Sequence, residues 1–380
     1  MYKYVKLAGT MALALAATAG MSMSQARTFE YATYLPPTHP TMAFALETMF
    51  DNVRARTDGR VNMKINPSGS LVDAKGVIGA LQSGLIDAGF IVPVYVPSEV
   101  PVNNVLSNTA IFMEDSVAVT GALNEMVLRH CPDCIKEYKD LGTVYLASYG
   151  TTPYHMMCNR EVNKTDDLKG LKIRSAGSAY SRWITRLGAT PVSMTNPETY
   201  EGLQRGQVNC MYGSLAWLKS LSIWDVAKNV YLKGAGAYGG GSLIAFNIDT
   251  WNEISADDRK TMISELPGAM ARLSIGYVNQ DNEAVELAKA EHNVRFAQGD
   301  SRIDALLTEH REAERQLIID DFVKNGGDAD KTAVMLDTFF DLLEKWSKIS
   351  AEVGTDVDLF AQKLDEEIYS RVDINALFSN

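Results

Sequence analysis

Hydrophobic and polar positions follow two periodic patterns along the first 92 residues. Residues 28–35, 61–65 and 86–92 show the alternating or wholly apolar patterns of strands, whereas residues 41–57 and 74–81 repeat apolar side chains every three or four positions, as a helix does. The resulting order β-α-β-α-β predicts a largely parallel sheet with helices crossing over its faces. In such sheets, ligands bind beyond the carboxyl ends of the strands.

A second run of the same kind follows. Its strands are predicted at 143–149, 154–158, 171–174 and 208–212, and its helices at 178–187, 196–206 and 214–221. Asn196 is expected to cap the middle helix, with Pro197 in the first turn. Two such runs predict an α/β protein of two lobes with a cleft between them. We expect residues 27–150 to begin lobe I, 151–240 to form lobe II, and 241–380 to return to lobe I.

The last third of the chain is helical in pattern. A helix begins near Ser255 and runs to about His292, roughly 50 Å at about 1.5 Å per residue, which is long enough to underlie both lobes. Two more amphipathic helices follow, and we interpret their apolar stripes as core-packing faces. The charged stretch near Asp365 predicts a last, solvated helix.

Residues 1–26 have the composition of a secretory signal peptide. Lys3 and Lys6 precede an apolar run at 7–17, and Ser24-Gln25-Ala26 fits a cleavage site. The alternative, a single membrane anchor, is disfavoured because the run is short. We expect export to the periplasm with cleavage after Ala26. Removal of this segment takes away two lysines and no acid, so the net charge of −11 becomes −13, which argues against a nucleic-acid partner.

One stretch carries the main candidate for chemistry. Asp167 and Gly170 supply turn residues, and Leu171 and Ile173 then alternate with polar residues in a strand that ends at Arg174. An arginine at a strand end, before small residues and a helix, is placed to bind a carboxylate through two parallel hydrogen bonds. The alternative is an ion pair with a neighbouring acid, and local sequence does not choose between the two. Aromatic residues at predicted loop and strand ends are candidates for the pocket walls: Tyr34, Tyr95, Tyr154, Tyr212, Trp217 and Tyr238.

The four cysteines of the chain suit an exported protein with disulfides. Cys131 and Cys134 form a C-x-x-C at the end of a predicted helix, for which a local structural disulfide is the favoured interpretation, with free thiols and redox or metal chemistry as alternatives. Cys158 and Cys210 lie in predicted strands of one lobe. We interpret them as buried small hydrophobes, with pairing between them left open.

Signatures of enzymes and cofactors are weak. Gly234 to Gly239 spell G-x-G-x-x-G, but a strand follows where a dinucleotide site needs a helix, so we expect a flexible connection or a close backbone approach between lobes. No H-E-x-x-H or G-x-S-x-G occurs. His310 and Glu314, four apart on a helix, favour a solvated ion pair over the edge of a metal site. We therefore expect no catalysis, no metal and no cofactor.

Several motifs together resemble a known family. Residues 167–174 (DLKGLKIR), 187–192 (LGATPV) and 198–208 (ETYEGLQRGQV), preceded by His39-Pro40, the Gly69 loop and residues 81–87, are similar to the extracytoplasmic solute-binding proteins of TRAP transporters, the DctP type. The resemblance runs from about residue 28 to 250. It implies the two-lobe periplasmic-binding-protein architecture, closure on a ligand whose carboxylate Arg174 holds, and delivery to the small and large membrane subunits of a sodium-driven importer.

The sequence departs from this family at two positions. Tyr154 stands where many members carry a second arginine, and Gly213 stands where many carry an asparagine. Two polar groups are thus missing, so we expect an organic acid with one key carboxylate and an apolar or aromatic body, rather than sialic acid or a four-carbon dicarboxylate. His39 and Gly213 join the candidate binding residues. The competing hypotheses are a secreted hydrolase or lyase on a two-lobe scaffold, and a ligand-sensing partner of a membrane receptor. We expect a monomer.

Overall fold

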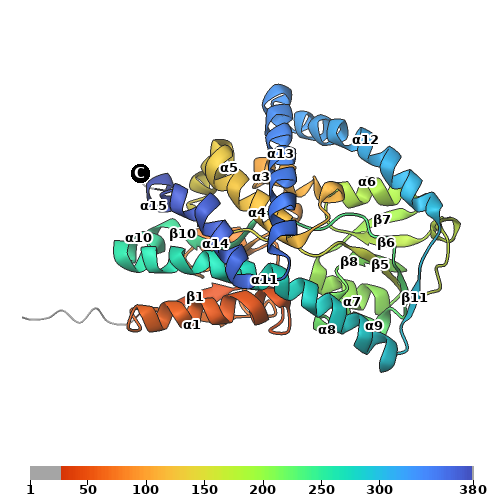
Figure 1. Ribbon diagram of the computed structural model, residues 1–380, viewed down its shortest axis with the longest axis horizontal. Helices are drawn as coiled ribbons and strands as arrows, with labels where there is room; N and C mark the ends of the chain where they lie inside the picture. Colours follow the sequence, from red (N-terminus) through yellow and green to blue (C-terminus); the bar gives the residue numbers. More distant parts are fainter. Residues whose placement is uncertain (1–26, 379–380) are drawn as a thin grey trace, which may run out of the picture.

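A computed structural model describes residues 27–378, and two β-sheets organise them (Figure 1). The first sheet has the order β2-β1-β3-β10-β4, with β1 parallel to β2 and β3, and β10 antiparallel to β3 and β4. Its strands are β1 (Arg27–Ala32), β2 (Val61–Asn66), β3 (Ala88–Ile91), β4 (Thr143–Tyr145) and β10 (Ser242–Asn247). The parallel part and its strands confirm the β-α-β-α-β prediction, whereas β10 enters antiparallel because it returns from the other lobe.

Helices cover this sheet and fill the chain between β3 and β4. The predicted helix at 41–57 is a π-helical turn, η1 (Thr41–Leu46), that continues as α1 (Glu47–Arg56), and the one at 74–81 is α2 (Val77–Gln82). The chain from 93 to 140 is largely helical: η2 (Pro93–Tyr95), α3 (Pro101–Ser107), η3 (Ala110–Phe112), α4 (Ser116–Glu125), η4 (Met126–His130) and α5 (Pro132–Asp140). α10 (Ile248–Glu253) follows β10 directly.

The second sheet has the order β11-β9-β5-β8-β6-β7. Its strands are β5 (His155–Cys158), β6 (Lys172–Ser175), β7 (Thr190–Ser193), β8 (Cys210–Gly213), β9 (Asn229–Tyr231) and β11 (Arg295–Ala297). Its short helices are η5 (Thr165–Leu168), α6 (Ser178–Arg186), α7 (Asn196–Gln204), α8 (Ala216–Ser220) and α9 (Ile223–Val226). β6 lies parallel to β7 and β8, so the carboxyl ends of these three strands meet at one edge, near the first sheet.

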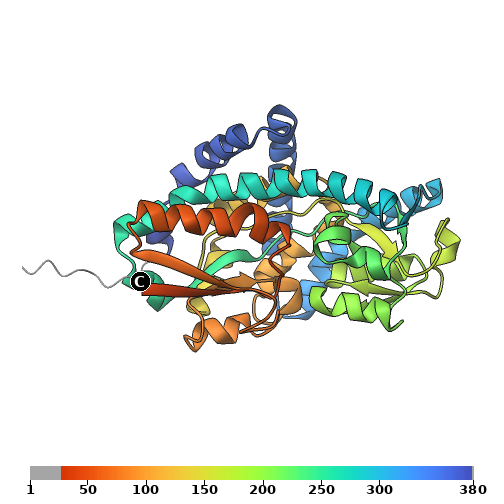
Figure 2. The ribbon, with the colours of Figure 1, turned by 90° about the horizontal axis from the view of Figure 1, so that it is seen from below.

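Three segments connect the two sheets. The chain crosses between β4 and β5 and again between β9 and β10, and these two crossings pair with each other at Gly150 and Gly239. The third is α11 (Ala256–Ala290), which runs the length of the molecule past both sheets (Figure 2) and contacts α1 and α4 on one side and α8 on the other. The expected long spanning helix is therefore present. The lobe bounds 27–150, 151–240 and 241–380 stay a prediction; within the last stretch, β11 belongs to the second sheet.

The G-x-G-x-x-G stretch lies in the second crossing, and the expected close backbone approach is confirmed. Gly236 has φ +69°, and a Cβ there would overlap the carbonyl oxygen of Ala110, which accepts a hydrogen bond from the Ala237 N–H at 3.0 Å. A Cβ at Gly239 would lie 2.7 Å from side chains of Leu123 and Val119 on α4. Glycine is thus needed because this backbone passes against η3 and α4, and no phosphate cradle is required to explain it.

The C-terminal helices pack on both lobes. α12 (Ser301–Lys324) contacts α6, α13 (Ala329–Val353) lies along α4, and α14 (Val357–Glu367) lies against α11, followed by η6 (Tyr369–Arg371) and α15 (Ile374–Leu377). The indole of Trp346 sits where Gly121 lacks a side chain and donates to Glu125 at 2.7 Å. The prediction of a solvated last helix is wrong for α14, because its own residues Phe360 and Leu364 are buried against the rest of the protein.

Both cysteine pairs are disulfides in the structure: Cys131 with Cys134, and Cys158 with Cys210. The first confirms the expected local disulfide, in the turn between η4 and α5. The second resolves what local sequence left open, because antiparallel pairing of β5 with β8 sets Cys158 directly opposite Cys210. Both pairs are buried, so they act as covalent parts of the core.

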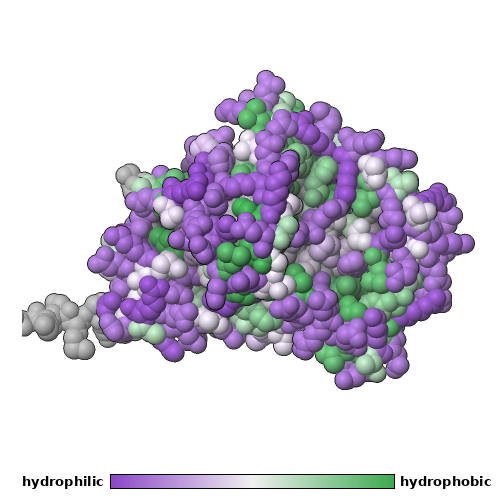
Figure 3. All heavy atoms as spheres, in the orientation of Figure 1, coloured by the Kyte–Doolittle hydropathy of each residue, from purple (hydrophilic) through white to green (hydrophobic). Residues whose placement is uncertain are grey.

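The surface seen in Figure 3 is mostly hydrophilic, with hydrophobic residues gathered toward the middle of the face. Within residues 27–378, no helix combines the length and the apolar character that a membrane crossing requires. The predicted export signal and its cleavage site after Ala26 lie outside the described residues.

Candidate functional site

Arg174 is buried near the end of β6, with 1% of its surface exposed. The turn before the strand is built as expected, because Gly170 adopts φ +74° and Leu168, Leu171 and Ile173 are buried. The Nε–H of Arg174 donates to the Met194 carbonyl at 2.9 Å and its Nη2 donates to the Tyr95 hydroxyl at 3.0 Å. Among the described residues, no carboxylate forms an ion pair with it and Nη1 has no hydrogen-bond partner.

A buried guanidinium without a carboxylate is unusual, because removing a charge from water is costly unless it is paired. The structure therefore decides against the alternative in which Arg174 serves only as one half of an internal ion pair. Two neutral oxygens hold its orientation and leave part of its hydrogen-bonding capacity free. This is the arrangement expected of a side chain whose anionic partner is a separate molecule.

Arg174 lines an enclosed cavity between the two sheets. The space open to the centre of a water-sized sphere is about 20 Å³. The lining residues are Tyr34, Leu35, His39, Val92, Val94, Tyr95, Tyr149, Tyr154, Arg174, Ala176, Asn196, Trp217 and Tyr238. The cavity is thus mainly aromatic and aliphatic, and Arg174 is its one permanently charged lining residue within 27–378.

Tyr95 connects the lobes inside this cavity. It belongs to η2, beyond β3 of the first sheet, and its hydroxyl oxygen accepts hydrogen bonds from Arg174 Nη2 and from the Asn196 N–H, both at 3.0 Å. Arg174 and Asn196 both belong to the second lobe. Because the oxygen accepts both bonds, its own proton is free to be donated to an anion beside the guanidinium.

Aromatic rings form the walls on both sides. Tyr34 packs edge-on to Tyr95 at 6.0 Å between ring centroids, and Tyr154 packs edge-on to Trp217 at 5.0 Å. The Tyr238 hydroxyl donates to the Gly240 carbonyl at 3.1 Å. Burial holds the pKa of Tyr34, Tyr154 and Tyr238 well above the usual tyrosine value, so these walls stay neutral at any physiological pH.

Two of the candidate residues lie behind the cavity wall. The rings of Tyr154, Tyr180 and Tyr212 stack in that order, with Tyr212 farthest from the cavity. The Tyr212 hydroxyl accepts a hydrogen bond from the Trp183 indole N–H at 2.9 Å. Gly213 contacts Trp217, since a Cβ at Gly213 would overlap the indole ring. Neither residue is among those that line the cavity, and both support the rings that do.

His39 lines the cavity as a neutral residue. Its Nδ1 lies 2.9 Å from the Thr41 hydroxyl and its Nε2 lies 3.1 Å from the Tyr277 hydroxyl on α11. Burial lowers the pKa of His39 to about 3, so the ring carries no charge that could bind an anion. Its hydrogen bonds fasten the start of η1 to the long helix.

Sequence reasoning missed Tyr149 and Asn196, which also line the cavity. The prediction that Asn196 caps the helix is wrong: Thr195 is the N-cap of α7 and forms a capping box with Glu198. The pattern Thr-x-x-Glu at 195–198 is the signal that could have found this, because it assigns the cap to threonine and releases the asparagine side chain. Tyr149 lies after β4 in the first crossing segment, where the local sequence pattern does not show whether a side chain points into the cavity.

The His310–Glu314 pair is buried rather than solvated, which corrects that expectation. Glu314 has no exposed side-chain surface, lies 3.2 Å from His310 Nε2, and binds Arg182 of α6 through both oxygens. Burial and nearby arginines lower the pKa of His310 to about 4. Within residues 27–378, no group of three or more His, Cys, Asp or Glu side chains could hold a metal ion. The contact of Glu314 with Arg182 joins α12 to α6.

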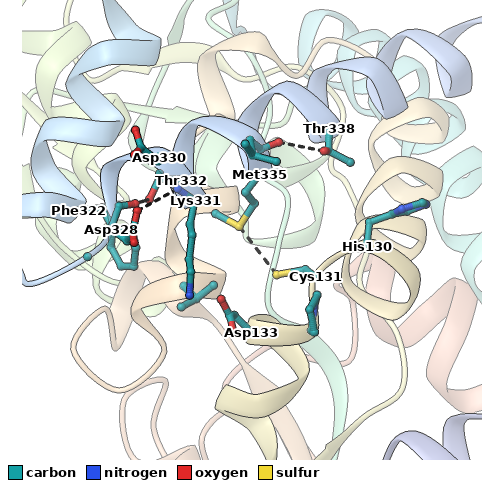
Figure 4. A pocket seen from close by; sticks show the side chains of 14 residues that line it. His130, Cys131, Asp133, Phe322, Asp328, Asp330, Lys331, Thr332, Met335 and Thr338 are labelled. Carbon is teal, nitrogen blue, oxygen red and sulfur yellow. Dashed lines mark hydrogen bonds between the residues drawn. The ribbon is translucent and has the colours of Figure 1, made fainter.

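A larger groove of about 490 Å³ lies away from the cavity, between the start of α13 and the Cys131–Cys134 turn (Figure 4). Cys131 Sγ lies 3.8 Å from Met335 Sδ across it. The groove contains none of the residues around Arg174. Size alone therefore does not identify the candidate site, and the buried arginine without an acidic partner makes the smaller cavity the stronger candidate.

Two α/β lobes joined by paired crossings and a long helix, with a buried arginine in an enclosed cavity between them, define a two-lobe solute-binding protein. The sequence model of bacterial extracellular solute-binding protein, family 7 (DctP), matches residues 31–310. The chain belongs to this family. The match ends within α12, so α13 to α15 lie outside the shared part.

Solved structures share the fold. A TRAP solute-binding protein of Rhodoferax ferrireducens, in complex with copurified benzoate, has a TM-score of 0.75 at 20% identity, covering 85% of this chain and 99% of that one. A TRAP protein of Bordetella bronchiseptica, with bound (R)- and (S)-mandelate, has a TM-score of 0.70 at 20% identity, covering 84% and 99%.

Curated relatives match over shorter stretches. A solute-binding protein of Chromohalobacter salexigens is 27% identical over 194 residues, which cover 50% of this chain and 56% of its own length. A second, from Albidiferax ferrireducens, is matched over 54% of its length at 22% identity. The chain thus spans little more than half the length of these relatives.

Proposed function

We propose that the protein is the solute-binding subunit of a TRAP importer and binds a small organic acid with one carboxylate. The observation that carries this proposal is the buried Arg174, which has no acidic partner among residues 27–378 and lines the cavity between the lobes. Its unused Nη1 and the free proton of the Tyr95 hydroxyl give the carboxylate two donors. Membership in an extracellular solute-binding family supports export and delivery to small and large membrane subunits.

The cavity walls support an apolar or aromatic body for the ligand. Within residues 27–378, Arg174 is the one permanently charged residue of the lining, and His39 is neutral because burial lowers its pKa. A second carboxylate would therefore be buried without a cation, which costs several kcal/mol. Benzoate and mandelate, bound by two proteins of the same fold, are aromatic monocarboxylates, and this similarity favours the same class here.

Binding requires that the lobes open. A space of about 20 Å³ holds the centre of a single water molecule, whereas an aromatic acid displaces many times that volume. The Tyr95–Arg174 and Tyr95–Asn196 bonds join the lobes across the site, so opening breaks them and closure restores them. Binding by closure needs no bond-making chemistry, and we propose that the ligand leaves unchanged.

The test is calorimetric titration with benzoate, mandelate and succinate, comparing the wild type with Arg174→Ala and Arg174→Lys. Loss of a buried partner for a carboxylate should weaken binding of the aromatic acids by about 2–5 kcal/mol in Arg174→Ala. Arg174→Lys should retain part of the affinity that Arg174→Ala loses, because lysine keeps the positive charge but cannot form two parallel hydrogen bonds with a carboxylate. Arg205→Ala, an exposed arginine paired with Glu201 on α7, is the matched control and should bind normally.

The proposal is wrong if Arg174→Ala loses less than tenfold in affinity while remaining folded, or if succinate binds best and the aromatic acids do not bind. Mass spectrometry of the recovered ligand separates this proposal from a hydrolase or lyase, which would return an altered molecule. Uptake into vesicles that contain the membrane subunits separates an importer from a ligand-sensing partner of a receptor.

A further inference from the structure

Asn196 lies between the cavity of Arg174 and a neighbouring groove that Pro36 and Ser222 help to line, and it carries an unused polar group. It is the first residue of α7, is 7% exposed and lines the same space as Arg174. Its side-chain oxygen Oδ1 is buried without a hydrogen-bond partner among the described residues. The buried, unpartnered polar atom of this side chain is thus its carbonyl oxygen, in the orientation that the structure gives the amide.

The local structure holds this amide in place without using it. Thr195 and Glu198 form the capping box that satisfies the start of α7, and the Asn196 N–H donates to the Tyr95 hydroxyl at 3.0 Å. Neither role needs the side chain. A buried carbonyl oxygen without a partner costs about 1–3 kcal/mol, so a function for it is expected at a residue that lines a ligand cavity.

Its position relative to Arg174 narrows what it would bind. Asn196 N and Arg174 Nη2 each lie 3.0 Å from the same Tyr95 oxygen, so they lie no more than 6 Å from each other. A ligand whose carboxylate meets Arg174 therefore brings a nearby substituent to the Asn196 amide. The side-chain carbonyl accepts a hydrogen bond, so that substituent is a donor, and a hydroxyl group on the acid is the simplest one.

We propose that Asn196 is a specificity-determining residue that selects a hydroxyl-bearing aromatic monocarboxylate, an inference that rests on the proposed function of the cavity. A hydroxylated acid satisfies the buried carbonyl, whereas the acid without the hydroxyl leaves it unpaired. Discrimination arises because a site built for a hydrogen bond penalises the analogue that cannot make it. Tyr34 and Tyr154 add neutral aromatic walls against which the ring of the ligand can pack.

The experiment measures dissociation constants of benzoate, the three hydroxybenzoates and mandelate for the wild type, Asn196→Ala and Asn196→Leu. We expect at least one hydroxylated acid to bind the wild type about 10- to 100-fold more tightly than benzoate. Both variants should reduce that preference to less than about threefold and bind benzoate at least as tightly as the wild type, because no buried carbonyl is then left unpaired. Val94→Ala, which alters an apolar part of the same lining, is the control and should weaken all five acids alike.

The possible outcomes distinguish failure of the Asn196 inference from failure of the proposed function. If benzoate and its hydroxylated forms bind the wild type equally, water satisfies Asn196, and the inference is wrong while the proposed function stands. If the preference survives in both Asn196 variants, another residue reads the hydroxyl and the inference is again wrong. If none of the aromatic acids binds the folded wild type, the proposed function itself is refuted.

Discussion

We predict that closure of the cleft depends on the Tyr95 hydroxyl, a group that Tyr95→Phe removes alone. In the closed structure this oxygen, carried by the first lobe, accepts one hydrogen bond from the Arg174 guanidinium and one from the Asn196 backbone, both in the second lobe. When the lobes part, water reaches all three groups. The substitution therefore acts on the closed state and leaves the open state nearly as it was.

The magnitude follows from the two donors that lose their partner. A charged donor left unpaired in a buried site costs about 1.5–3 kcal/mol and a backbone N–H costs about 0.5–1.5 kcal/mol. Together these give about 2–4.5 kcal/mol against closure, which corresponds to a loss of roughly 30- to 2,000-fold in ligand affinity if binding requires the closed state. A ligand carboxylate that also contacts Arg174 would bring the loss toward the lower bound.

Two measurements check this prediction. Calorimetry should show the weaker binding, and small-angle X-ray scattering at saturating ligand should show that the variant still closes once enough ligand is present. Tyr34→Phe is the matched control, because the Tyr34 hydroxyl lines the same cavity and makes no hydrogen bond within residues 27–378. A loss of less than threefold in Tyr95→Phe, or an equal loss in Tyr34→Phe, would show that this hydroxyl does not link closure to binding.

Two further predictions concern stability. Replacing Cys158 and Cys210 by alanine should lower the free energy of unfolding by about 4 kcal/mol, because their disulfide closes a loop with a sequence separation of 52. The same change at Cys131 and Cys134, which are three residues apart, should lower it by less than about 2 kcal/mol. Urea denaturation of both double variants measures the two losses, and equal losses would contradict the prediction. Burial raises the pKa of Asp281 to about 6, so between pH 4 and 6 the folded state holds the extra proton and stability falls as pH rises. Asp281→Asn, which keeps an oxygen to accept from Ser214 and the Ala216 N–H, should therefore be more stable than the wild type at pH 7.5, by up to about 3 kcal/mol, with the difference vanishing toward pH 4; a pH-independent difference would refute this.

Sequence pattern predicted the elements well because each signal was local. Alternation and three-to-four spacing located β1, α1, β2, α2 and β3, and Gly170 marked the turn before Arg174. The Gly234–Gly239 stretch was interpreted correctly because a following strand excluded a nucleotide cradle. Arg174 was singled out by the residues beside it, and its lack of an acidic partner became visible only once both lobes were folded around it.

The disulfide pairing, the burial of Glu314 and the composition of the cavity wall depend on the direction in which side chains point and on strand register, and the pattern of a single sequence contains neither. Cys158 meets Cys210 because β5 and β8 pair in one particular register. Glu314 is buried because Arg182 arrives from another helix, which no spacing within α12 could show. Sequence pattern selected Tyr212 as a pocket candidate and passed over Tyr149, whereas the fold places Tyr149 in the cavity wall and Tyr212 behind it.

The two departures from the family pattern form one structural change. Gly213, which stands in place of an asparagine, leaves the space that the Trp217 indole occupies, because a Cβ at Gly213 would overlap that ring. Trp217 in turn packs edge-on against Tyr154, which stands in place of an arginine. Restoring either polar residue alone would break this aromatic wall without rebuilding a second cationic site. The residues at both positions thus meet at Trp217, and a lining whose one permanent charge within residues 27–378 is Arg174 supports the proposal of an acid with one carboxylate and an aromatic body.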